Sequence, residues 1–207
     1  MALPKSPFIV HRDFLSPKIC EDIVCALGFY TPDFNKEGKP IKMVREHEDA
    51  ESIIFEKFQL IIPTLEQYYG FNHRGTEPIS FEYYAEGVES QPQSENSNMV
   101  NKKWARTKDR DLSCVLFLCD YQDNVPFDND YEVYGGKLEF LTHQFGFNPQ
   151  RGTLIVYPSG PNFVNIVSPI FVGDSIMARF HIASMLPYVY NPNNFPGNYT
   201  NWFKGLF

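Results

Sequence analysis

The sequence contains no run of about 18 apolar residues, which is the length that a helix needs to cross a lipid bilayer. Its N-terminal residues also lack the apolar core of a secretory signal peptide, so we expect a cytoplasmic protein with no membrane partner. The four cysteines, Cys20, Cys25, Cys114 and Cys119, include no pair with CxxC spacing. We therefore expect buried thiols in place of a zinc or redox centre.

Positive charge is scarce in this chain. Lys and Arg together number 18 against 25 Asp and Glu, which gives a formal net charge of −7. A chain with this balance binds the phosphate backbone poorly, so no nucleic-acid partner is expected. The sequence has no phosphate-binding glycine loop and no stripe of basic and aromatic residues. Ser113 and Ser159 have no catalytic base that the sequence makes evident.

Aromatic residues, by contrast, are abundant at 16% of the chain. Flat rings pack well on a pleated sheet, so this content favours a core rich in β-strands. A length of 207 residues is enough for one domain with a full hydrophobic core.

The N-terminal part of the chain predicts helices. A short strand is expected at residues 8–14, followed by a helix at 16–28 whose Ser-Pro start suits a cap and a first turn. Residues 31–42 are rich in Pro, Gly, Lys and Asp and predict a loop. A second helical stretch is expected at 48–69, and Pro63 should kink or split it.

From Pro78 onward the periodicity becomes that of strands separated by Gly and Pro turns. Strands are expected at residues 79–84, 112–118, 137–141, 153–157, 163–167 and 176–183. Helices followed by many short antiparallel strands predict an α+β, mainly β fold, namely a jelly roll (double-stranded β-helix) backed by N-terminal helices. The side chains expected in its core are Leu116, Leu118, Leu154, Val156, Phe163 and Phe180.

The last 21 residues differ from the rest of the chain. We divide the protein into a jelly-roll domain with N-terminal helices at 1–186 and a C-terminal docking tail at 187–207. The tail is rich in Asn, Pro and Gly but carries seven aromatic residues. Such residues are typical anchors at protein interfaces. We expect the tail to dock on this domain or on a neighbouring chain through Tyr190, Phe195, Trp202 and Phe207.

Six segments occur in a fixed order over most of the chain, and they carry a resemblance to a known family. They are Phe-Ile-Val-His-Arg-Asp-Phe-Leu-Ser-Pro-Lys-Ile-Cys at 8–20, Tyr-Ala-Glu-Gly at 84–87, Arg-Asp-Leu-Ser and the following strand at 110–118, Gly-Gly-Lys-Leu-Glu-Phe at 135–140, residues 148–159 and residues 163–173. Together they resemble prolyl-4-hydroxylase-like members of the iron(II)/2-oxoglutarate oxygenase superfamily. These segments are also similar to those of oxygenase-like proteins carried by tailed phages. A virus particle is therefore a second expected location.

The resemblance implies a metal site, but this chain lacks its imidazoles. Enzymes of this family hold Fe(II) with two histidines and a carboxylate, and the first two ligands lie two residues apart on one strand. The match places these positions at Gln93, Glu95 and Asn165, and we expect the three side chains to converge. Two amides are poor ligands for Fe(II), so the set resembles a degenerate site. Three interpretations remain open for Gln93 and Asn165, namely ordinary hydrogen-bonded amides in a closed former pocket, a relict or weak hard-cation site, and an alignment shifted by a few residues.

Two other histidines, His47 and His143, are not expected to bind a metal. His47-x-Asp49 has the spacing of the family motif, but it precedes the barrel, so we expect a solvated surface there. His143 follows the Gly-Gly hairpin and is expected on the surface or in a loop.

The resemblance also implies a basic residue that binds the distal carboxylate of 2-oxoglutarate, about ten residues after the second histidine. Ser175 occupies that position, and Arg179 lies further along the same predicted strand face. Arg179 and Tyr84 are therefore the candidates for binding 2-oxoglutarate. The alternatives are an arginine paired with a carboxylate and a tyrosine that belongs to the core.

Two functions follow from these expectations. The first is a non-catalytic module of the oxygenase fold, structural or binding in role, with no cofactor, a protein partner or neighbouring subunit held by the tail, and a place in a virus particle. The second is an active Fe(II)/2-oxoglutarate-dependent dioxygenase that hydroxylates a prolyl or other peptide side chain. Another enzyme or a lectin-like use of the jelly roll is a third, smaller alternative.

Overall fold

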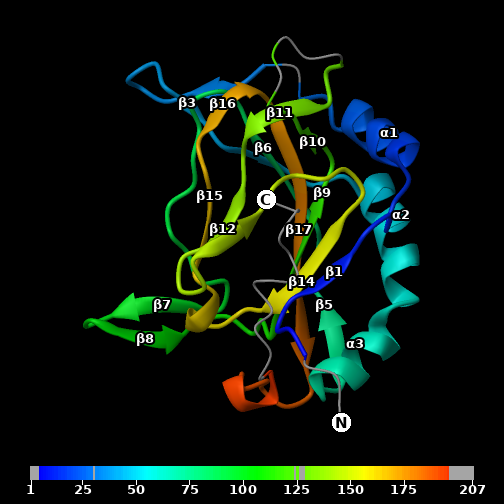
Figure 1. Ribbon diagram of the computed structural model, residues 1–207, viewed down its shortest axis with the longest axis vertical. Coiled ribbons are helices and arrows are strands. Elements are labelled where there is room, and N and C mark those ends of the chain that lie inside the picture. Colours follow the sequence, from blue (N-terminus) through cyan, green and yellow to red (C-terminus); the bar gives the residue numbers. More distant parts are fainter. Residues whose placement is uncertain (1–4, 30, 124, 126–128, 196–207) are drawn as a thin grey trace.

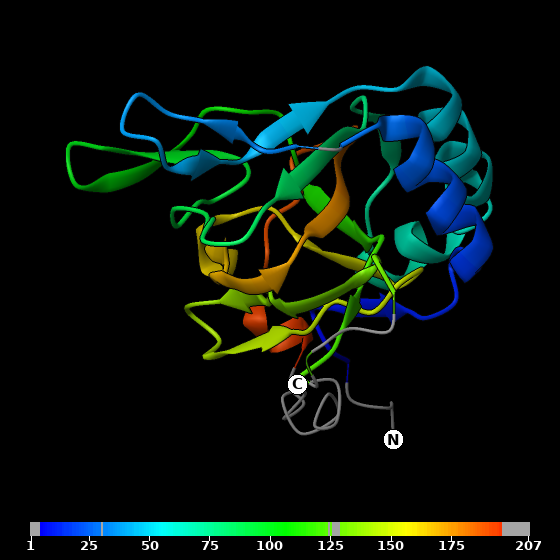
Figure 2. The same ribbon diagram turned by 90° about the horizontal axis from the view of Figure 1, so that it is seen from above.

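The fold has three layers, with helices on one side, a large sheet in the middle and smaller sheets on the other side (Figures 1 and 2). The computed structural model describes residues 5–29, 31–123, 125 and 129–195. Two of the expected tail anchors, Trp202 and Phe207, lie outside these residues.

The middle layer is a seven-stranded sheet. Its strands, in spatial order, are β1 (Ile9–His11), β14 (Leu154–Pro158), β9 (Leu112–Phe117), β17 (Ser175–Ser184), β6 (Ser80–Tyr84) and β4 (Met43–Arg45), with β5 (His73–Thr76) paired to the end of β17. All the pairings in this sheet are antiparallel.

Two three-stranded sheets form the layer that faces it (Figure 1). One contains β10 (Asp120–Tyr121), β11 (Glu132–Gly135) and β16 (Ile170–Gly173), and the other contains β13 (Phe145–Phe147), β12 (Leu138–Phe140) and β15 (Asn165–Val167). The β10–β11 pair is parallel, and the other pairs are antiparallel. The prediction of a mainly β jelly roll backed by helices is confirmed.

Three helices cover the outer face of the large sheet (Figure 2). They are α1 (Pro17–Leu27), α2 (Glu48–Gln59) and α3 (Ile62–Tyr69). The Ser16 hydroxyl caps α1 by accepting a hydrogen bond from the Ile19 amide, as the Ser-Pro start predicts. Phe58 of α2 packs edge-on against Phe180 of β17, with ring centroids 4.8 Å apart. None of the described helices combines the length and the apolar character that crossing a membrane requires.

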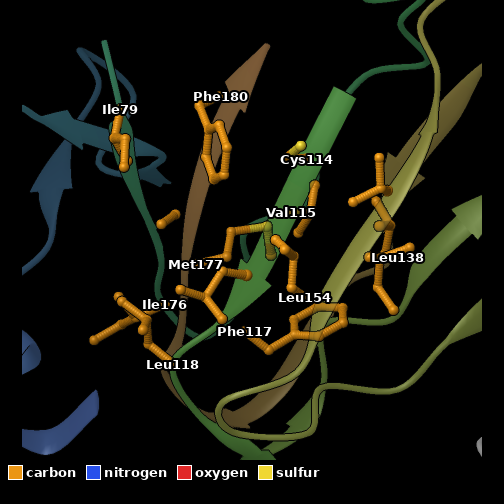
Figure 3. Close-up of a cluster of buried hydrophobic side chains, with 14 of the residues drawn as sticks. Ile79, Cys114, Val115, Phe117, Leu118, Leu138, Leu154, Ile176, Met177 and Phe180 are labelled. Atoms are coloured by element: carbon orange, nitrogen blue, oxygen red, sulfur yellow. The ribbon is translucent and has the colours of Figure 1, made fainter. Parts of the chain in front are cut away.

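Strand alternation divides β17 between the two sides of the large sheet. Phe180 points to the helices, whereas Met177 and Arg179 point to the smaller sheets. Figure 3 shows part of the resulting core, with Met177 from β17, Val115 from β9 and Leu138 from β12. All six side chains that the sequence predicts to be buried have no exposed surface.

Several local predictions were wrong. The predicted loop at 31–42 contains a hairpin of β2 (Asp33–Phe34) and β3 (Pro40–Ile41). A second hairpin, β7 (Ser97–Val100) and β8 (Lys103–Arg106), was not predicted because its residues are mostly polar. Phe163 ends a 3₁₀ turn and precedes β15 instead of beginning it. Cys25 is exposed, although the other three cysteines are buried as expected.

The described part of the tail packs on its own domain. The Tyr188 amide donates a hydrogen bond of 2.8 Å to the buried carboxylate of Asp111. Tyr190 packs edge-on against Phe163 at 4.8 Å, and Phe195 is only 5% exposed. Residues 187–195 therefore close one end of the jelly roll, and docking on a neighbouring chain stays a prediction.

We predict that Phe195→Ala lowers the free energy of unfolding by about 1.5 to 3 kcal/mol, because the large ring is almost fully buried. Val189→Ala is the matched control in the same segment, since Val189 is 79% exposed, and its effect should stay within about 0.5 kcal/mol. Urea unfolding of both variants measures the difference. Equal stability of the two variants would show that the segment contributes little to the fold.

Candidate functional site

The space between the two layers contains a cluster of charged and polar side chains that the strand registers bring together. Arg179 of β17 shares the inner face with Met177, which is paired with Glu82 of β6. On the other side, His181 of β17 is paired with Ser113 of β9, and Ser113 is paired with Tyr157 of β14. Paired residues of adjacent strands point to the same face, so all these side chains lie inside the jelly roll.

The three positions that the resemblance assigns to the metal converge on one oxygen atom. Gln93 and Asn165 pair through their backbones, with two hydrogen bonds of 3.0 Å. Their side-chain amides donate to Glu95 Oε1, from Gln93 at 3.1 Å and from Asn165 at 3.3 Å. That these residues form a degenerate metal site stays a prediction.

Arg179 is the central residue of the cluster. Its Nη1 donates a 2.7 Å hydrogen bond to Glu95 Oε1, the same oxygen that accepts from both amides. The same nitrogen donates to the Tyr157 hydroxyl at 3.1 Å and lies 3.5 Å from Asn165 Oδ1. The Arg179 Nε donates to Glu82 Oε2 at 3.2 Å. The guanidinium, which is only 4% exposed, therefore connects the carboxylates of Glu82 and Glu95.

Glu82 links the cluster to the edge of the large sheet. Its carboxylate accepts a hydrogen bond of 2.5 Å from Lys42 Nζ and another of 2.9 Å from the Tyr84 hydroxyl. Lys42, Arg179, Glu82 and Glu95 supply two positive and two negative charges, so the four side chains balance one another. We call these four residues the ionic cluster.

The charges of the ionic cluster determine its pKa values. Burial by itself raises the pKa of Glu82, but Arg179 and Lys42 outweigh burial, so this pKa lies below its usual value. Burial by itself lowers the pKa of Arg179, but the carboxylates of Glu82 and Glu95 raise it well above its usual value. Burial, followed by Glu82, raises the pKa of Tyr84, which stays a neutral hydrogen-bond donor.

A polar branch extends from Glu95 through a histidine and two serines. His181 Nε2 lies 3.7 Å from Glu95 Oε2, and its Nδ1 lies 3.1 Å from the Ser113 hydroxyl, which is 2.6 Å from the Ser159 hydroxyl. The serines do have a histidine neighbour that the sequence did not make evident. Ser113 and Ser159 are at most 1% exposed, so this arrangement satisfies buried hydroxyls and gives a substrate no access.

His47 and His143 lie elsewhere in the fold, whereas Tyr84 borders the ionic cluster. His47 caps α2, where its Nδ1 accepts from the Ala50 amide at 3.3 Å. His143 lies in the turn after β12 and packs against Phe163, and burial lowers its pKa to about 4. Tyr84 is fully buried and bonded to Glu82, which agrees with the alternative that it belongs to the core.

The sequence reasoning missed Glu82, although the sequence contains a signal for it. Residues 80–84 read Ser-Phe-Glu-Tyr-Tyr, so one face of the strand carries Ser80, Glu82 and Tyr84. A single carboxylate in an otherwise aromatic inner strand requires a buried cation as its partner. This requirement points to Arg179, the one arginine in the inner strand at 176–183.

No family model matches this sequence, and no curated protein matches it either. Solved structures do resemble it. A viral collagen prolyl hydroxylase from Paramecium bursaria Chlorella virus-1, in complex with 2OG, matches with a TM-score of 0.63 and 16% identity, over 87% of this chain and 97% of that one. A Pseudomonas putida prolyl-4-hydroxylase matches with a TM-score of 0.59 and 15% identity, over 87% and 94%.

The chain has the prolyl-4-hydroxylase fold. A third structure, a prolyl hydroxylase from Trichoplax adhaerens in complex with a hypoxia-inducible-factor peptide, agrees, with a TM-score of 0.60 and 12% identity over 86% of this chain and 84% of that one. At these identities the likeness concerns the fold alone. The expected resemblance to prolyl-4-hydroxylase-like oxygenases is thereby confirmed at the level of the fold.

The residues of the cluster do not fit the cofactors that this fold implies. Glu95 Oε1 already accepts hydrogen bonds from three nitrogen atoms, and Arg179 places a positive charge where the metal ion would have to approach. Two donor groups of Arg179 are bonded to Glu82 and Glu95, so the distal carboxylate of 2-oxoglutarate would compete with two internal carboxylates. Among the described residues, no group of three or more His, Cys, Asp and Glu is arranged for a metal ion.

We predict that Arg179→Met lowers the free energy of unfolding by about 3 to 5 kcal/mol, because it leaves two buried carboxylates without their shared cation. Arg74→Met is the matched control, since Arg74 pairs with Asp109 on the surface and should contribute less than about 1 kcal/mol. Chemical denaturation measures both. Equal losses would contradict a central role for Arg179.

A second prediction concerns pH. Burial, followed by Arg110 and Arg179, lowers the pKa of His181 well below its usual value, so His181 is neutral in the folded protein. The unfolded chain therefore binds more protons below about pH 6.5, and stability falls as the pH drops, by up to about 1.4 kcal/mol per pH unit for this residue. His181→Gln should reduce the slope of unfolding free energy between about pH 6.5 and pH 5. An unchanged slope would contradict the burial of a neutral imidazole.

Proposed function

We propose that this protein is a non-catalytic module of the prolyl-4-hydroxylase fold with a structural or binding role. The observation that carries the proposal is the Arg179 guanidinium, which bonds to the carboxylate at the metal position and to a second internal carboxylate. An internal cation thus takes over the charge balance that a metal ion would provide. Neither Gln93 nor Asn165 supplies an imidazole.

The burial of the cluster supports the same proposal. Asn165 and Tyr84 have no exposed surface, and Glu95 and Arg179 are at most 5% exposed. Their polar atoms are bonded to one another, which is the arrangement of a satisfied structural network. An active site, by contrast, needs groups that are free to bind a substrate.

The second candidate is an active 2-oxoglutarate-dependent dioxygenase that acts on a prolyl or other peptide side chain. The solved structures with the same fold favour it, because all three are described as prolyl hydroxylases. The retained carboxylate of Glu95 and the inward position of Arg179 are compatible with an altered site of this kind.

Incubation of the full chain with Fe(II), ascorbate, 2-oxoglutarate and prolyl peptides distinguishes the two candidates. We expect no succinate above that of the metal-free control, and no charge-transfer band when Fe(II) and 2-oxoglutarate are added without oxygen. Stoichiometric iron binding with succinate formation would overturn the proposal in favour of the enzyme.

A gain-of-binding variant provides the positive control. Gln93→His with Asn165→His restores the imidazoles, and the further change Arg179→Met removes the competing cation. We expect the triple variant to bind Fe(II) more tightly than the double variant, provided that circular dichroism shows both to be folded. Equal affinities would show that Arg179 does not oppose the metal.

The wider biological setting is also part of the proposal. Docking of the tail on a neighbouring subunit follows from the aromatic content of the tail, and a place in a virus particle follows from the sequence resemblance. Both stay predictions. The contacts of residues 187–195 with Asp111 and Phe163 support a role of this segment in closing its own domain first.

A further inference from the structure

The outer face of the smaller sheets contains a hollow that is separate from the ionic cluster. Its volume is about 500 Å³, and it lies where the β10–β11–β16 sheet meets the β13–β12–β15 sheet. A β-bulge between Tyr134 and Gly135 breaks the strand there. Gly135 has a φ of +105°, and a Cβ atom at this position would lie 2.2 Å from the Pro169 carbonyl oxygen. The bulge therefore requires glycine, and it shapes the hollow.

Three aromatic rings form a row along one side of the hollow. They belong to Tyr121, Tyr134 and Phe171, on the three strands β10, β11 and β16. The ring centroids are 6.1 Å apart between Tyr121 and Tyr134 and 5.2 Å apart between Tyr134 and Phe171. Tyr134 is 37% exposed and Phe171 is 55% exposed, so the row offers apolar surface to a ligand.

Polar groups without partners line the other side of the hollow. Lys137, Glu139 and Asn148 are all half-buried. Within the described part of the chain, their side chains make no hydrogen bond or ion pair, and Lys137 and Glu139 do not pair with each other. The Ser168 hydroxyl accepts a bond from the Lys137 backbone amide and can still donate one. These half-buried side chains face the hollow and keep hydrogen-bonding capacity that is available to a ligand.

A second hollow shares lining residues with the first. Its volume is about 260 Å³, and it is lined by Lys137 and Glu139, which also line the larger hollow, and by Gln144 and Phe145. We call the two hollows, with the aromatic row and the shared Lys137–Glu139 pair, the groove. Two hollows that share lining residues suit a chain of linked units better than a single small molecule.

We propose that this groove binds a neutral oligosaccharide. The C–H faces of sugar rings stack on aromatic rings, whose faces are electron-rich, and sugar hydroxyls both donate and accept hydrogen bonds. The groove provides aromatic rings for stacking. It also provides an ammonium, a carboxylate and an amide that can donate to and accept from sugar hydroxyls. A nucleic acid is a poorer candidate, because the net charge of −7 on the chain repels its phosphate backbone. A peptide that adds as a strand would use the backbone of a sheet edge, whereas side chains on a sheet face line this groove.

Isothermal titration calorimetry of the full chain with maltohexaose, cellohexaose and chitohexaose tests the proposal. At least one sugar should bind, and Tyr134→Ala with Phe171→Ala should weaken it about tenfold or more. Trp104→Ala is the matched control, because Trp104 is an exposed aromatic residue on the separate β7–β8 hairpin, and it should leave the affinity unchanged. Far-UV circular dichroism verifies the fold of each variant.

Glu139→Gln provides a second test, because it removes the charge and keeps the size of the side chain. It should weaken the same sugar while leaving the stability unchanged, because the carboxylate makes no bond of its own in the described structure. Absence of binding by all three sugars at millimolar concentration would overturn the proposal. Binding that survives the loss of both aromatic rings would also overturn it. Decaproline serves as the competing probe, and if it alone binds and needs both rings, the groove is a peptide site.

Discussion

The interior of this protein depends on one buried guanidinium. Arg179 extends from the central strand of the large sheet to Glu95 and Asn165, which belong to the facing layer and its flank. A buried charge is tolerated only when it is paired and fully hydrogen-bonded, and each neighbour of Arg179 meets part of that demand. The identities of Glu82, Tyr157 and Asn165 are thereby coupled to that of Arg179, because removal of any one leaves another buried polar group unsatisfied.

This constraint bears on the positions that the sequence resemblance assigns to a metal. A buried carboxylate such as that of Glu95 needs a cation beside it. A metal ion is one such cation, and an arginine on the neighbouring inner strand is another. Arg179 bonds to Glu95, and the amides of Gln93 and Asn165 donate to the same oxygen. The guanidinium and the two amides thus supply the donors that this buried carboxylate requires.

The sequence predicted those features that depend on local pattern. Strand alternation placed Arg179 and Phe180 on opposite faces, as the structure shows, and Ser16 marked the start of α1. Features that depend on partners far away in the chain were missed. The lone carboxylate of residues 80–84 signals a buried cation, but the partner of Glu82 depends on the register in which β6 pairs with β17, and no local pattern specifies that register. The polar β7–β8 hairpin lacks hydrophobic alternation, so its strands gave no signal.

The polar side chains between the sheets differ from those on the outer face in how their hydrogen bonds are satisfied. Between the sheets, Arg179 bonds to Glu82 and Glu95, and all three residues are at most 5% exposed, which leaves a ligand little access to them. On the outer face, Lys137, Glu139 and Asn148 border the groove, and their side chains make no hydrogen bond or ion pair within the described residues. A polar group whose bonds are satisfied internally stabilises a fold, whereas one that faces an open hollow is available to a ligand. Within the described residues, unused bonding capacity therefore lies on the outer face of this jelly roll, where we propose that the ligand binds.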